Sequence, residues 1–220
     1  MGREKRSKDL VKTIVGVSRD LFLHKGYRET TIRQIIDSVC IKNGTLYHFF
    51  KDKEDIFCHV CLTTYDEYIR YVDSVTEDED VVLQYAMTRA LEFKMVEEND
   101  MIARLYEEAY SSWRVAEALT PINMARNRQL FHQFNPAFTD DDYRNRTLAL
   151  RGMRALLISD RVHSGPGRFR SWCPFAIETA LVLFNVPKKE IDRAIAKAMD
   201  LIAEHDIAAV MTHQEAYPGA

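Results

Sequence analysis

The chain has 220 residues, of which 46% are hydrophobic and 29% are charged, a balance that excludes extensive intrinsic disorder. No apolar run approaches the roughly 18 residues of a membrane-spanning helix. The longest candidate, residues 176–186, is shorter and contains Glu178 and Asn185. The basic N-terminus leads into no apolar segment, so neither a membrane anchor nor export is expected. Four scattered cysteines are typical of reduced thiols in a cytoplasmic protein.

Charge is distributed unevenly along the chain, although the net charge is only -3. Residues 1–53 contain 12 Lys and Arg but 6 Asp and Glu, whereas residues 54–220 contain 18 Lys and Arg and 27 Asp and Glu. A basic head on an acidic body indicates a polyanionic partner for the head. A chance fluctuation of surface charge would give the same counts, so charge alone does not decide the function.

All predicted elements are helices, with no credible strand and no internal repeat. Apolar residues at i, i+4, i+7 and i+11 from Leu10 to Leu21 predict a first helix over about 7–25, and Gly26 suits its left-handed C-terminal cap. Longer helices are also expected over about 53–73, 81–97, 101–111, 120–134, 140–163, 174–184 and 187–205. Residues 211–220 are expected to be a loose tail.

The boundaries of these later helices follow from capping and breaking residues. Asp52 is expected to cap the helix that begins at residue 53. Thr120 suits an N-cap, with Pro121 at the first helical position. Residues 164–167, Ser-Gly-Pro-Gly, form the clearest loop in the chain.

Two short helices follow the first one. Thr31 and Gln34 fit a capping box at the start of a helix about two turns long. Another short helix is expected over 43–49, with Leu46 and Phe49 facing inward. Two short helices behind a supporting helix match a helix-turn-helix. Such a motif reads DNA when the outer face of its second helix carries small polar or cationic groups.

The residues expected to contact double-stranded DNA are Thr31, Lys42, Asn43, Gly44, Thr45, Tyr47, His48 and Lys53. Gly44 lets the backbone approach the duplex closely, and Thr45 can hydrogen-bond a base or pack against a thymine methyl group. The basic and aromatic side chains of the set are expected to reach phosphates. Thr31 lies at a helix N-terminus, which also favours phosphate.

Four motifs within residues 22–57 identify this module more specifically than periodicity does. They are Lys25-Gly26-Tyr27, Thr30-Thr31-Ile32, Gly44-Thr45-Leu46-Tyr47-His48-Phe49-Phe50 and Lys51-Asp52-Lys53-Glu54-Asp55-Ile56. Together they resemble the DNA-binding module of the TetR family of transcriptional regulators.

Two positions depart from the pattern that this resemblance implies. Cys40 stands where the family usually has Gly in the turn, and Lys42 stands where it has Ser at the start of the recognition helix. If the turn needs a positive φ, Cys40 carries strain of order 1 kcal/mol. Lys42 cannot cap the helix as Ser does, but it adds a cation beside the DNA.

The resemblance implies an all-α chain with a three-helix head over residues 1–53 and a larger effector-binding and dimerisation body over residues 54–220. A homodimer is also expected independently of the resemblance, because one short recognition helix reads too few bases, whereas a dimer reads two half-sites about 34 Å apart. The apolar seam is expected on the long helix and the last two helices, at Ala149, Met153, Leu156, Leu157, Ala180, Leu183, Phe184, Ile191, Ile195 and Met199. The alternative is that these residues fill the core of the monomer.

The middle of the chain is rich in large, soft side chains that suit an apolar effector pocket. The candidates for binding a small-molecule effector are Met87, Met101, Tyr106, Tyr110, Trp113 and Phe131. At helical spacing, such residues are also what an ordinary core contains. Arg104, Glu107 and Arg114 are either polar anchors of the pocket or surface charges.

Few residues outside the head and the candidate pocket suggest metal binding, redox chemistry or catalysis. Cys58 and Cys61 form a C-x-x-C, but no second ligand pair completes a metal site, so they are interpreted as packing residues, with thiol sensing as the alternative. No catalytic constellation is found, so no enzyme activity and no cofactor are expected. The sequence therefore predicts a cytoplasmic, ligand-responsive transcriptional regulator that binds a palindromic operator as a homodimer and is released by its effector. A repressor is expected, although the sequence does not distinguish a repressor from an activator. The alternative is a helical ligand-binding or thiol-sensing protein that does not bind DNA.

Overall fold

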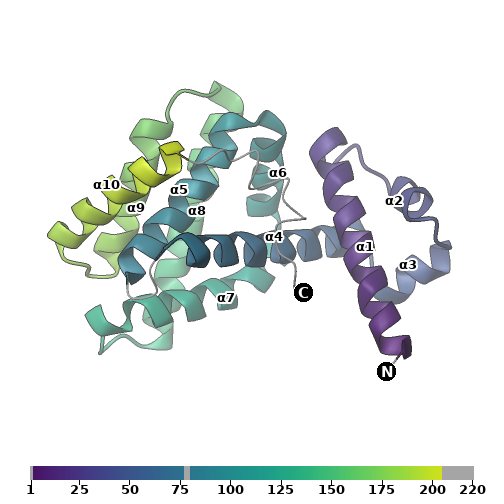
Figure 1. Ribbon diagram of the computed structural model, residues 1–220, viewed down its shortest axis with the longest axis horizontal. Helices are drawn as coiled ribbons and strands as arrows, with labels where there is room; N and C mark the ends of the chain where they lie inside the picture. The colour runs from purple at the N-terminus through teal and green to yellow at the C-terminus, as the bar shows by residue number, and fades with distance from the viewer. Residues whose placement is uncertain (1, 77–79, 205–220) are drawn as a thin grey trace.

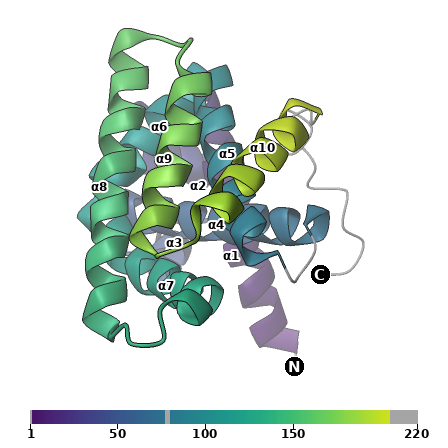
Figure 2. The ribbon, with the colours of Figure 1, turned by 90° about the vertical axis from the view of Figure 1, so that its left-hand side faces the viewer.

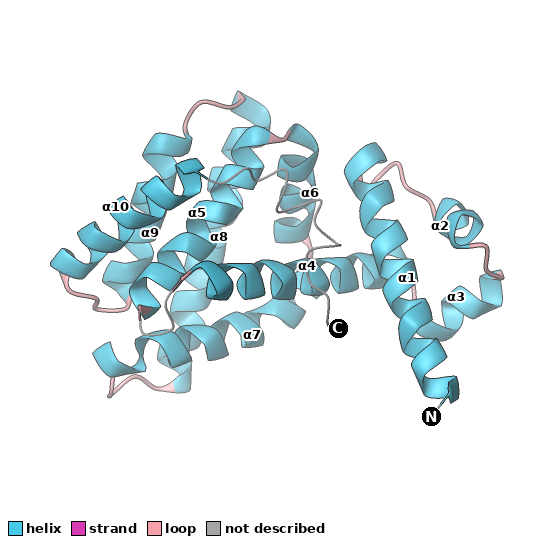
Figure 3. Cartoon of the chain, in the orientation of Figure 1, coloured by secondary structure: helices cyan, strands magenta, loops and turns pink. Residues whose placement is uncertain are grey.

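The computed structural model describes residues 2–76 and 80–204, so the predicted tail over 211–220 lies outside the described residues. These two ranges contain helices and no strand, which confirms the all-α prediction (Figure 3). The helices are α1 (Gly2–Lys25), α2 (Ile32–Val39), α3 (Asn43–Phe49), α4 (Lys53–Val75), α5 (Val81–Glu98), α6 (Asp100–Ser111), α7 (Trp113–Phe131), the 3-10 helix η1 (His132–Phe134), α8 (Asp140–Ser164), α9 (Phe169–Leu183) and α10 (Lys188–Glu204).

Helices α1, α2 and α3 form a head at one end of the long helix α4, and the remaining helices gather around the other part of α4 (Figure 1). The head has a small apolar core. Phe22 of α1, Ile35 of α2 and Leu46 of α3 are fully buried in it, together with Phe57 from the second turn of α4. The rings of Phe22 and Phe57 meet edge to face, with centroids 5.6 Å apart. The first turns of α4 therefore belong to the core of the head.

Helix α5 is the central element of the body. Nearly every side chain over residues 82–96 is buried, on all sides of the helix, and the buried set includes the polar side chains of Gln84, Thr88, Arg89 and Glu92. It packs against α4, α6, α9 and α10. Further along the body core, the rings of Phe131 and Phe184 stack with centroids 4.6 Å apart.

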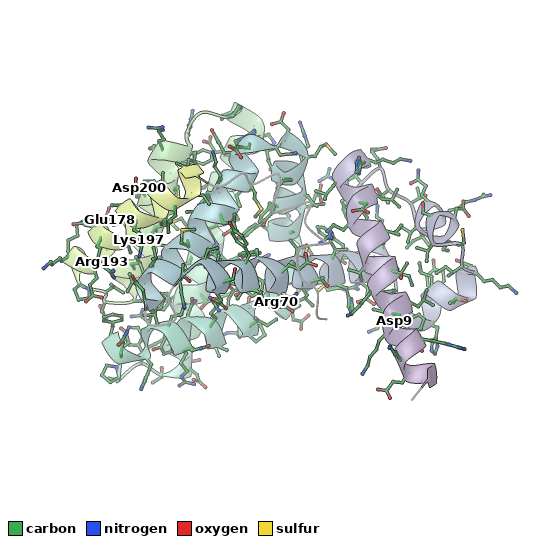
Figure 4. All side chains as sticks on the ribbon, viewed as in Figure 1. Asp9, Arg70, Glu178, Arg193, Lys197 and Asp200 are labelled. Carbon is green, nitrogen blue, oxygen red and sulfur yellow. The ribbon has the colours of Figure 1, made fainter. Side chains whose placement is uncertain are left out.

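Two surfaces of the body differ in character. Helices α8 and α9 lie side by side on the side of the body away from the head (Figure 2). Their outer face exposes several large apolar side chains: Leu148, Leu156, Phe175, Val182 and Leu183. The outer face of α10 is polar instead, with Arg193, Lys197 and Asp200 pointing outward (Figure 4). No helix in the described part of the chain is both long enough and apolar enough to cross a membrane.

The predicted dimer seam is partly wrong. Ala180, Phe184 and Ile191 are at most 1% exposed and belong to the core of the monomer, so they cannot form a surface seam. Leu156 and Leu183 are exposed as the prediction requires. Four other members of the predicted seam are partly buried against the core of the monomer: Met153, Leu157, Ile195 and Met199.

Helix α1 begins at Gly2 rather than at about residue 7. Two predicted helix starts in the body were also wrong. Helix α7 begins at Trp113 rather than after Thr120, because Ser112 caps it by accepting from the backbone N–H of Val115. Thr120 lies inside the helix, where its hydroxyl donates to the carbonyl of Ala116 at 2.6 Å, and Pro121 follows it within the same helix. The burial of Val115 and Ala116 favours continuation of the helix over the local preference of proline for a helix start.

The other misplaced start is that of α9. It begins at Phe169, immediately after a loop in which Gly165 and Gly167 adopt positive φ, and it contains Pro174 in its second turn. Trp172 and Cys173 are buried against the body. Burial of this first turn extends the helix upstream of the proline, which the sequence pattern had placed at the boundary.

Candidate nucleic-acid interface and ligand cavity

The helix-turn-helix begins with the predicted capping box. The Thr31 hydroxyl oxygen accepts from the backbone N–H of Gln34 at 3.2 Å, and the Gln34 side-chain oxygen accepts from the backbone N–H of Thr31 at 2.8 Å. The two bonds satisfy donors that a helix N-terminus otherwise leaves unpaired. They fix the start of α2 and hence the direction in which the turn leaves it.

The turn between α2 and α3 requires a left-handed residue, and that residue is Cys40. Its φ is 58° and its ψ is 41°, and its backbone N–H is directed at the carbonyls of Ile36 and Asp37 at the end of α2. A residue with a Cβ in this region carries a cost of order 1 kcal/mol that glycine avoids. The side chain of Cys40 is exposed.

Helix α3 is fixed from below and open on its outer side. Leu46 is fully buried, and the following Phe50 is 1% exposed. Residues at positions 43, 44, 47 and 48 recur along one face of the helix and are exposed, and Tyr47 is 50% exposed. Thr45 is half-buried. This combination of an anchored inner face and a polar outer face is what a recognition helix needs.

Two details of α3 concern its first turn. Lys42 is the N-cap in an extended conformation, and its side chain makes no capping hydrogen bond. A Cβ added at Gly44 would meet no atom of the described chain within 4 Å, so the backbone there is uncovered. The first turn of α3 therefore presents bare backbone N–H groups and a lysine to whatever approaches it.

Lys53 has a different position from the one predicted. Its Nζ donates to the backbone carbonyls of Tyr27, Arg28 and Thr30 at 2.8, 3.2 and 2.9 Å, and it lies over the Tyr27 ring, 4.4 Å from the centroid. An ammonium group has three N–H donors, and all three are used here. The expectation that Lys53 clamps a phosphate is therefore corrected: in this structure it ties the α1–α2 loop to the start of α4.

Charged contacts connect the head to the body at the start of α4. Asp52 caps α4 by accepting from the backbone N–H of Asp55 at 2.8 Å, and it also accepts from the Arg114 guanidinium of α7 at 2.5 Å. The hydrogen bond from Arg114 lowers the pKa of the Asp52 carboxyl. Next to this pair, the Ser112 hydroxyl donates to Glu54 at 2.8 Å. The N-terminus of α7 is thus attached directly to the end of the head.

A cavity of about 100 Å³ lies in the body between α4, α5, α6, α7 and α8. It is lined by Phe57, Val60, Cys61, Thr64, Tyr65, Tyr68, Arg89, Glu92, Leu105, Tyr106, Ala109, Tyr110, Val115, Leu119, Asn123, Arg151 and Arg154. Phe57, Val60 and Val115 also belong to the core cluster of the head. The cavity is therefore walled on one side by residues of the head core and on the other by those of the body.

One end of the cavity carries a buried network of charges. Glu92 accepts from Arg89 Nη1 and from the Tyr110 hydroxyl, each at 2.5 Å, and Tyr110 in turn accepts from Arg154 Nε at 2.8 Å. The second terminal nitrogen of Arg89 donates to the Tyr68 hydroxyl at 3.3 Å. Burial raises the pKa of Tyr110 to about 12, so its hydroxyl remains a proton donor at neutral pH.

The predicted effector-binding residues are only partly brought together. Tyr106 and Tyr110 line the cavity, whereas Met87 and Phe131 are fully buried in the body core outside its lining. Trp113 is 77% exposed at the start of α7, so its predicted place in a pocket is corrected. Another candidate, Met101, lies near Gly26 instead of the cavity.

The three candidate polar anchors also lie elsewhere. Arg114 pairs with Asp52, Glu107 accepts from Ser159, and Arg104 is exposed. The charges that do line the cavity, on α5 and α8, were missed. The available signal was an Arg and a Glu at positions i and i+3 of α5, within a run that is mostly apolar.

Of the C-x-x-C pair, Cys61 lines the same cavity, whereas Cys58 lies outside its lining. Cys58 is buried and Cys61 is half-buried, and burial raises the pKa of the Cys61 thiol to about 12 and also raises that of Cys58. A raised pKa suppresses the thiolate that sensing chemistry needs. Within the described residues, no group of three or more His, Cys, Asp or Glu side chains is placed to hold a metal ion.

Sequence comparison supports the interpretation of the head as a helix-turn-helix DNA-binding module. The family described as "Bacterial regulatory proteins, tetR family" matches residues 14–60. The HTH-type transcriptional regulator QacR of Staphylococcus aureus is 36% identical over 52 residues, which is 24% of this chain and 28% of QacR. The uncharacterised HTH-type regulator YhgD of Bacillus subtilis is 28% identical over 108 residues, which is 44% of this chain and 56% of YhgD. The chain therefore matches about a quarter and about half of these two relatives.

Structural comparison covers more than nine-tenths of the chain. The crystal structure of RolR in complex with resorcinol has a TM-score of 0.64, and the alignment covers 92% of this chain and 97% of RolR. Full-length TylP, a TetR regulator from Streptomyces fradiae, has a TM-score of 0.54, with 94% and 96% covered. Both are 17% identical to the chain, so they show its fold. Residues 14–60 therefore match the TetR family of bacterial regulatory proteins, and the chain has the same fold as RolR and TylP.

Proposed function

We propose that this chain is a cytoplasmic transcriptional repressor, not an enzyme, that binds a palindromic DNA operator as a homodimer and releases it when a small-molecule effector enters the body. The observation that carries the proposal is helix α3, anchored by the fully buried Leu46 and exposing Lys42, Asn43, Tyr47 and His48. Bases are read by the outer face of such a helix, and phosphates by the groups at its ends.

Dimerisation is supported by the exposed apolar face of α8 and α9. Leu156 is 75% exposed, Phe175 56% and Val182 54%, which is unusual for side chains of this size on a monomer surface. Gly152 lies one turn before Leu156 on α8, and a Cβ there would meet no described atom within 4 Å. An exposed glycine in a long helix weakens that helix, and we propose that it lets a second copy of α8 approach closely.

Coupling between effector and DNA is proposed to act through Phe57. Its ring lines the cavity, and it also packs against Tyr27 of the head, with ring centroids 4.4 Å apart. An occupant that displaces this ring changes the position of the head and hence the spacing of the two recognition helices in the dimer. RolR, which shares the fold, was determined with resorcinol bound, and by analogy we propose that this body also binds an organic effector.

DNA binding is tested by gel shifts with a duplex that carries the promoter region of the chain's own gene, at two salt concentrations. Affinity is expected to fall steeply with salt because phosphate contacts dominate. Lys42→Gln is expected to reduce the slope of log affinity against log salt by about 0.9 per lost contact. Arg70→Gln, an exposed charge on α4 far from the head, is the matched control and is expected to change nothing (Figure 4). Failure to bind any such duplex would refute the proposal.

The role of Tyr47 can be separated from base recognition. Tyr47→Phe is expected to weaken binding to all duplexes by a similar factor, because a phosphate contact carries no sequence information. A loss confined to one base position would instead place Tyr47 against a base. For the effector, equal affinity for free and operator-bound protein would contradict the release mechanism, since linkage requires different affinities for the two states.

A further inference from the structure

The cavity restricts the size of its occupant. Its volume is about 100 Å³, which is smaller than the roughly 150 Å³ of an engineered protein cavity that binds benzene. A single ring therefore already needs slightly more room than the present walls enclose, so one ring with one small substituent is the largest occupant expected, and the walls must shift a little to admit it. A fused two-ring molecule requires α4, α6 and α7 to move apart.

The two ends of the cavity differ in chemistry. Val60 on α4 and Leu105 on α6 give one end an apolar surface, which Val115 and Leu119 of α7 continue. The guanidinium groups that line the cavity come from α5 and α8, and those of Arg89 and Arg154 belong to the network around Glu92. A fitting occupant has an apolar body and one polar group at its end.

The charged end has an excess of positive charge. The lining contains three arginines, Arg89, Arg151 and Arg154, and one acidic residue, Glu92. Both carboxylate oxygens of Glu92 already accept hydrogen bonds, from Arg89 and from Tyr110. Glu92 therefore has little capacity to receive a cationic ligand, whereas the arginines are not balanced by equal negative charge.

Arg89 also has an unused donor. It is 4% exposed, and its Nε has no hydrogen-bond partner among the residues that the structure describes. A buried N–H without an acceptor is unfavourable, and the cost is relieved when an acceptor arrives. An anionic oxygen is the acceptor that a guanidinium group binds best.

We infer that the cavity binds a compact organic carboxylate with a single ring, of the size of benzoate. Its ring lies between the apolar residues of α4, α6 and α7, and its carboxylate is received by Arg89 and Arg154. The inference rests on the proposed function only for the role of this ligand as the effector; binding itself depends on the cavity alone.

Isothermal titration of the full-length protein without DNA, near neutral pH, tests the ligand class. The probes are benzoate, its neutral isostere benzamide, the neutral diol resorcinol, the cation benzylamine and the two-ring anion 2-naphthoate. Benzoate is expected to bind about 10-fold or more tightly than each of the other four, because a charge-assisted bond is lost or the ring is too large.

Arg154→Gln separates recognition of the anion from general support of the cavity. It is expected to weaken benzoate binding about 10-fold or more while leaving benzamide binding nearly unchanged; a purely structural role would weaken both. Arg146→Gln, two turns earlier on α8 and outside the lining, is the matched control. If Arg154→Gln does not fold, Leu119→Phe, which fills the apolar end and keeps every arginine, is expected to abolish benzoate binding.

Three results would overturn the inference. These are no benzoate binding up to about 10 mM, benzamide or resorcinol binding as tightly as benzoate, and a preference for benzylamine. A gel shift with benzoate is then run separately. If benzoate binds the free protein but does not release the operator, the ligand class stands and the proposed release mechanism fails. If no operator is bound at all, the titrations still decide the ligand class.

Discussion

The head and the body bury polar groups in different ways. In the head, the buried polar side chains are hydroxyls bonded to local carbonyls: Ser18 donates to Ile14 at 2.7 Å and Thr30 to Gly26 at 2.8 Å. In the body, Arg89 and Glu92 are 4% and 2% exposed, and their network joins α4, α5, α6 and α8. The buried polar groups of the head therefore only stabilise its own helices, whereas the buried charges of the body line a cavity and are available to bind a ligand.

The largest expected effect comes from breaking the charge network of the body. Glu92→Leu leaves Arg89 and Arg154 buried without their carboxylate, so the free energy of unfolding is expected to fall by about 3–5 kcal/mol. Adding Arg89→Met to the same chain is expected to restore part of the loss, because a buried pair replaced by apolar groups is far less costly than a broken pair. Urea unfolding at fixed protein concentration measures both variants and Arg89→Met alone.

The double-mutant cycle decides whether the network acts as a unit. A coupling energy above about 0.5 kcal/mol is expected between Glu92 and Arg89. Additive losses within that limit would contradict the interpretation and make the network three separate buried charges. The same measurement on Arg146 and Asp142, a half-buried i, i+4 pair on α8, serves as the control and is expected to show weak coupling.

The head is expected to respond to an apolar deletion instead. Leu46→Ala removes the side chain that anchors α3 and is expected to cost about 2–5 kcal/mol, while Leu46→Met costs less than about 1.5 kcal/mol. Operator binding is expected to be lost with Leu46→Ala, while titration of the body with benzoate is unchanged. A loss of stability below about 1 kcal/mol would show that α3 is not anchored by Leu46.

The contrast between the head and the body also explains which features could be predicted from the sequence. The structure of the head depends mainly on residues close together in the sequence. Thr31 forms a capping box with Gln34, three residues later, and residues 43–49 form one short helix in which Leu46 is buried. Such local patterns predict the fold and the exposed face of α3. They did not predict that Lys53 would bind three carbonyls more than 20 residues away.

The cavity was beyond local reasoning because its lining comes from five helices far apart in the chain. Large apolar side chains are suited equally to a ligand pocket and to a core, and Met87 and Phe131 are buried in the core of the body. The register of α7 also depended on tertiary burial, since Thr120 and Pro121 gave a plausible but incorrect start. Of the predicted residues, Tyr106 and Tyr110 do line the cavity. The charges within the mostly apolar run of α5 were a further signal, but that signal does not identify their partners on α6 and α8.

A smaller effect is expected where each region uses a left-handed turn residue. Cys40 in the head has φ 58° and Asn185 in the body has φ 53°. Asn tolerates this conformation better than Cys does, and Asn185 also donates to Asn135 at 2.7 Å. Cys40→Gly is therefore expected to raise the free energy of unfolding by up to about 1 kcal/mol.

Matched glycine substitutions distinguish relief of strain from other effects. Ser38→Gly, an exposed position inside α2, is expected to lower stability by about 0.5–1 kcal/mol. Asn185→Gly is expected to show less gain than Cys40→Gly, since it removes a hydrogen bond. Thermal unfolding of the three variants makes the comparison, and a loss of stability in Cys40→Gly would mean that the Cys40 side chain stabilises the turn by more than the strain it carries.

The smallest expected effect lies at the joint between the two regions. Arg114 of the body lowers the pKa of Asp52, the N-cap of α4. A carboxyl whose pKa is lower in the folded state stabilises that state above its unfolded pKa of about 3.9 and loses this contribution as pH falls through the folded value. Asp52→Asn retains a good N-cap but removes the charge. Its melting temperature is expected to lie slightly below that of the parent chain at pH 7 and to converge with it as the pH falls below about 4, whereas Asp52→Ala, which also loses the cap, stays lower at every pH. A constant difference between Asp52→Asn and the parent across this range would show that the Arg114 contact holds the head to the body through geometry rather than charge.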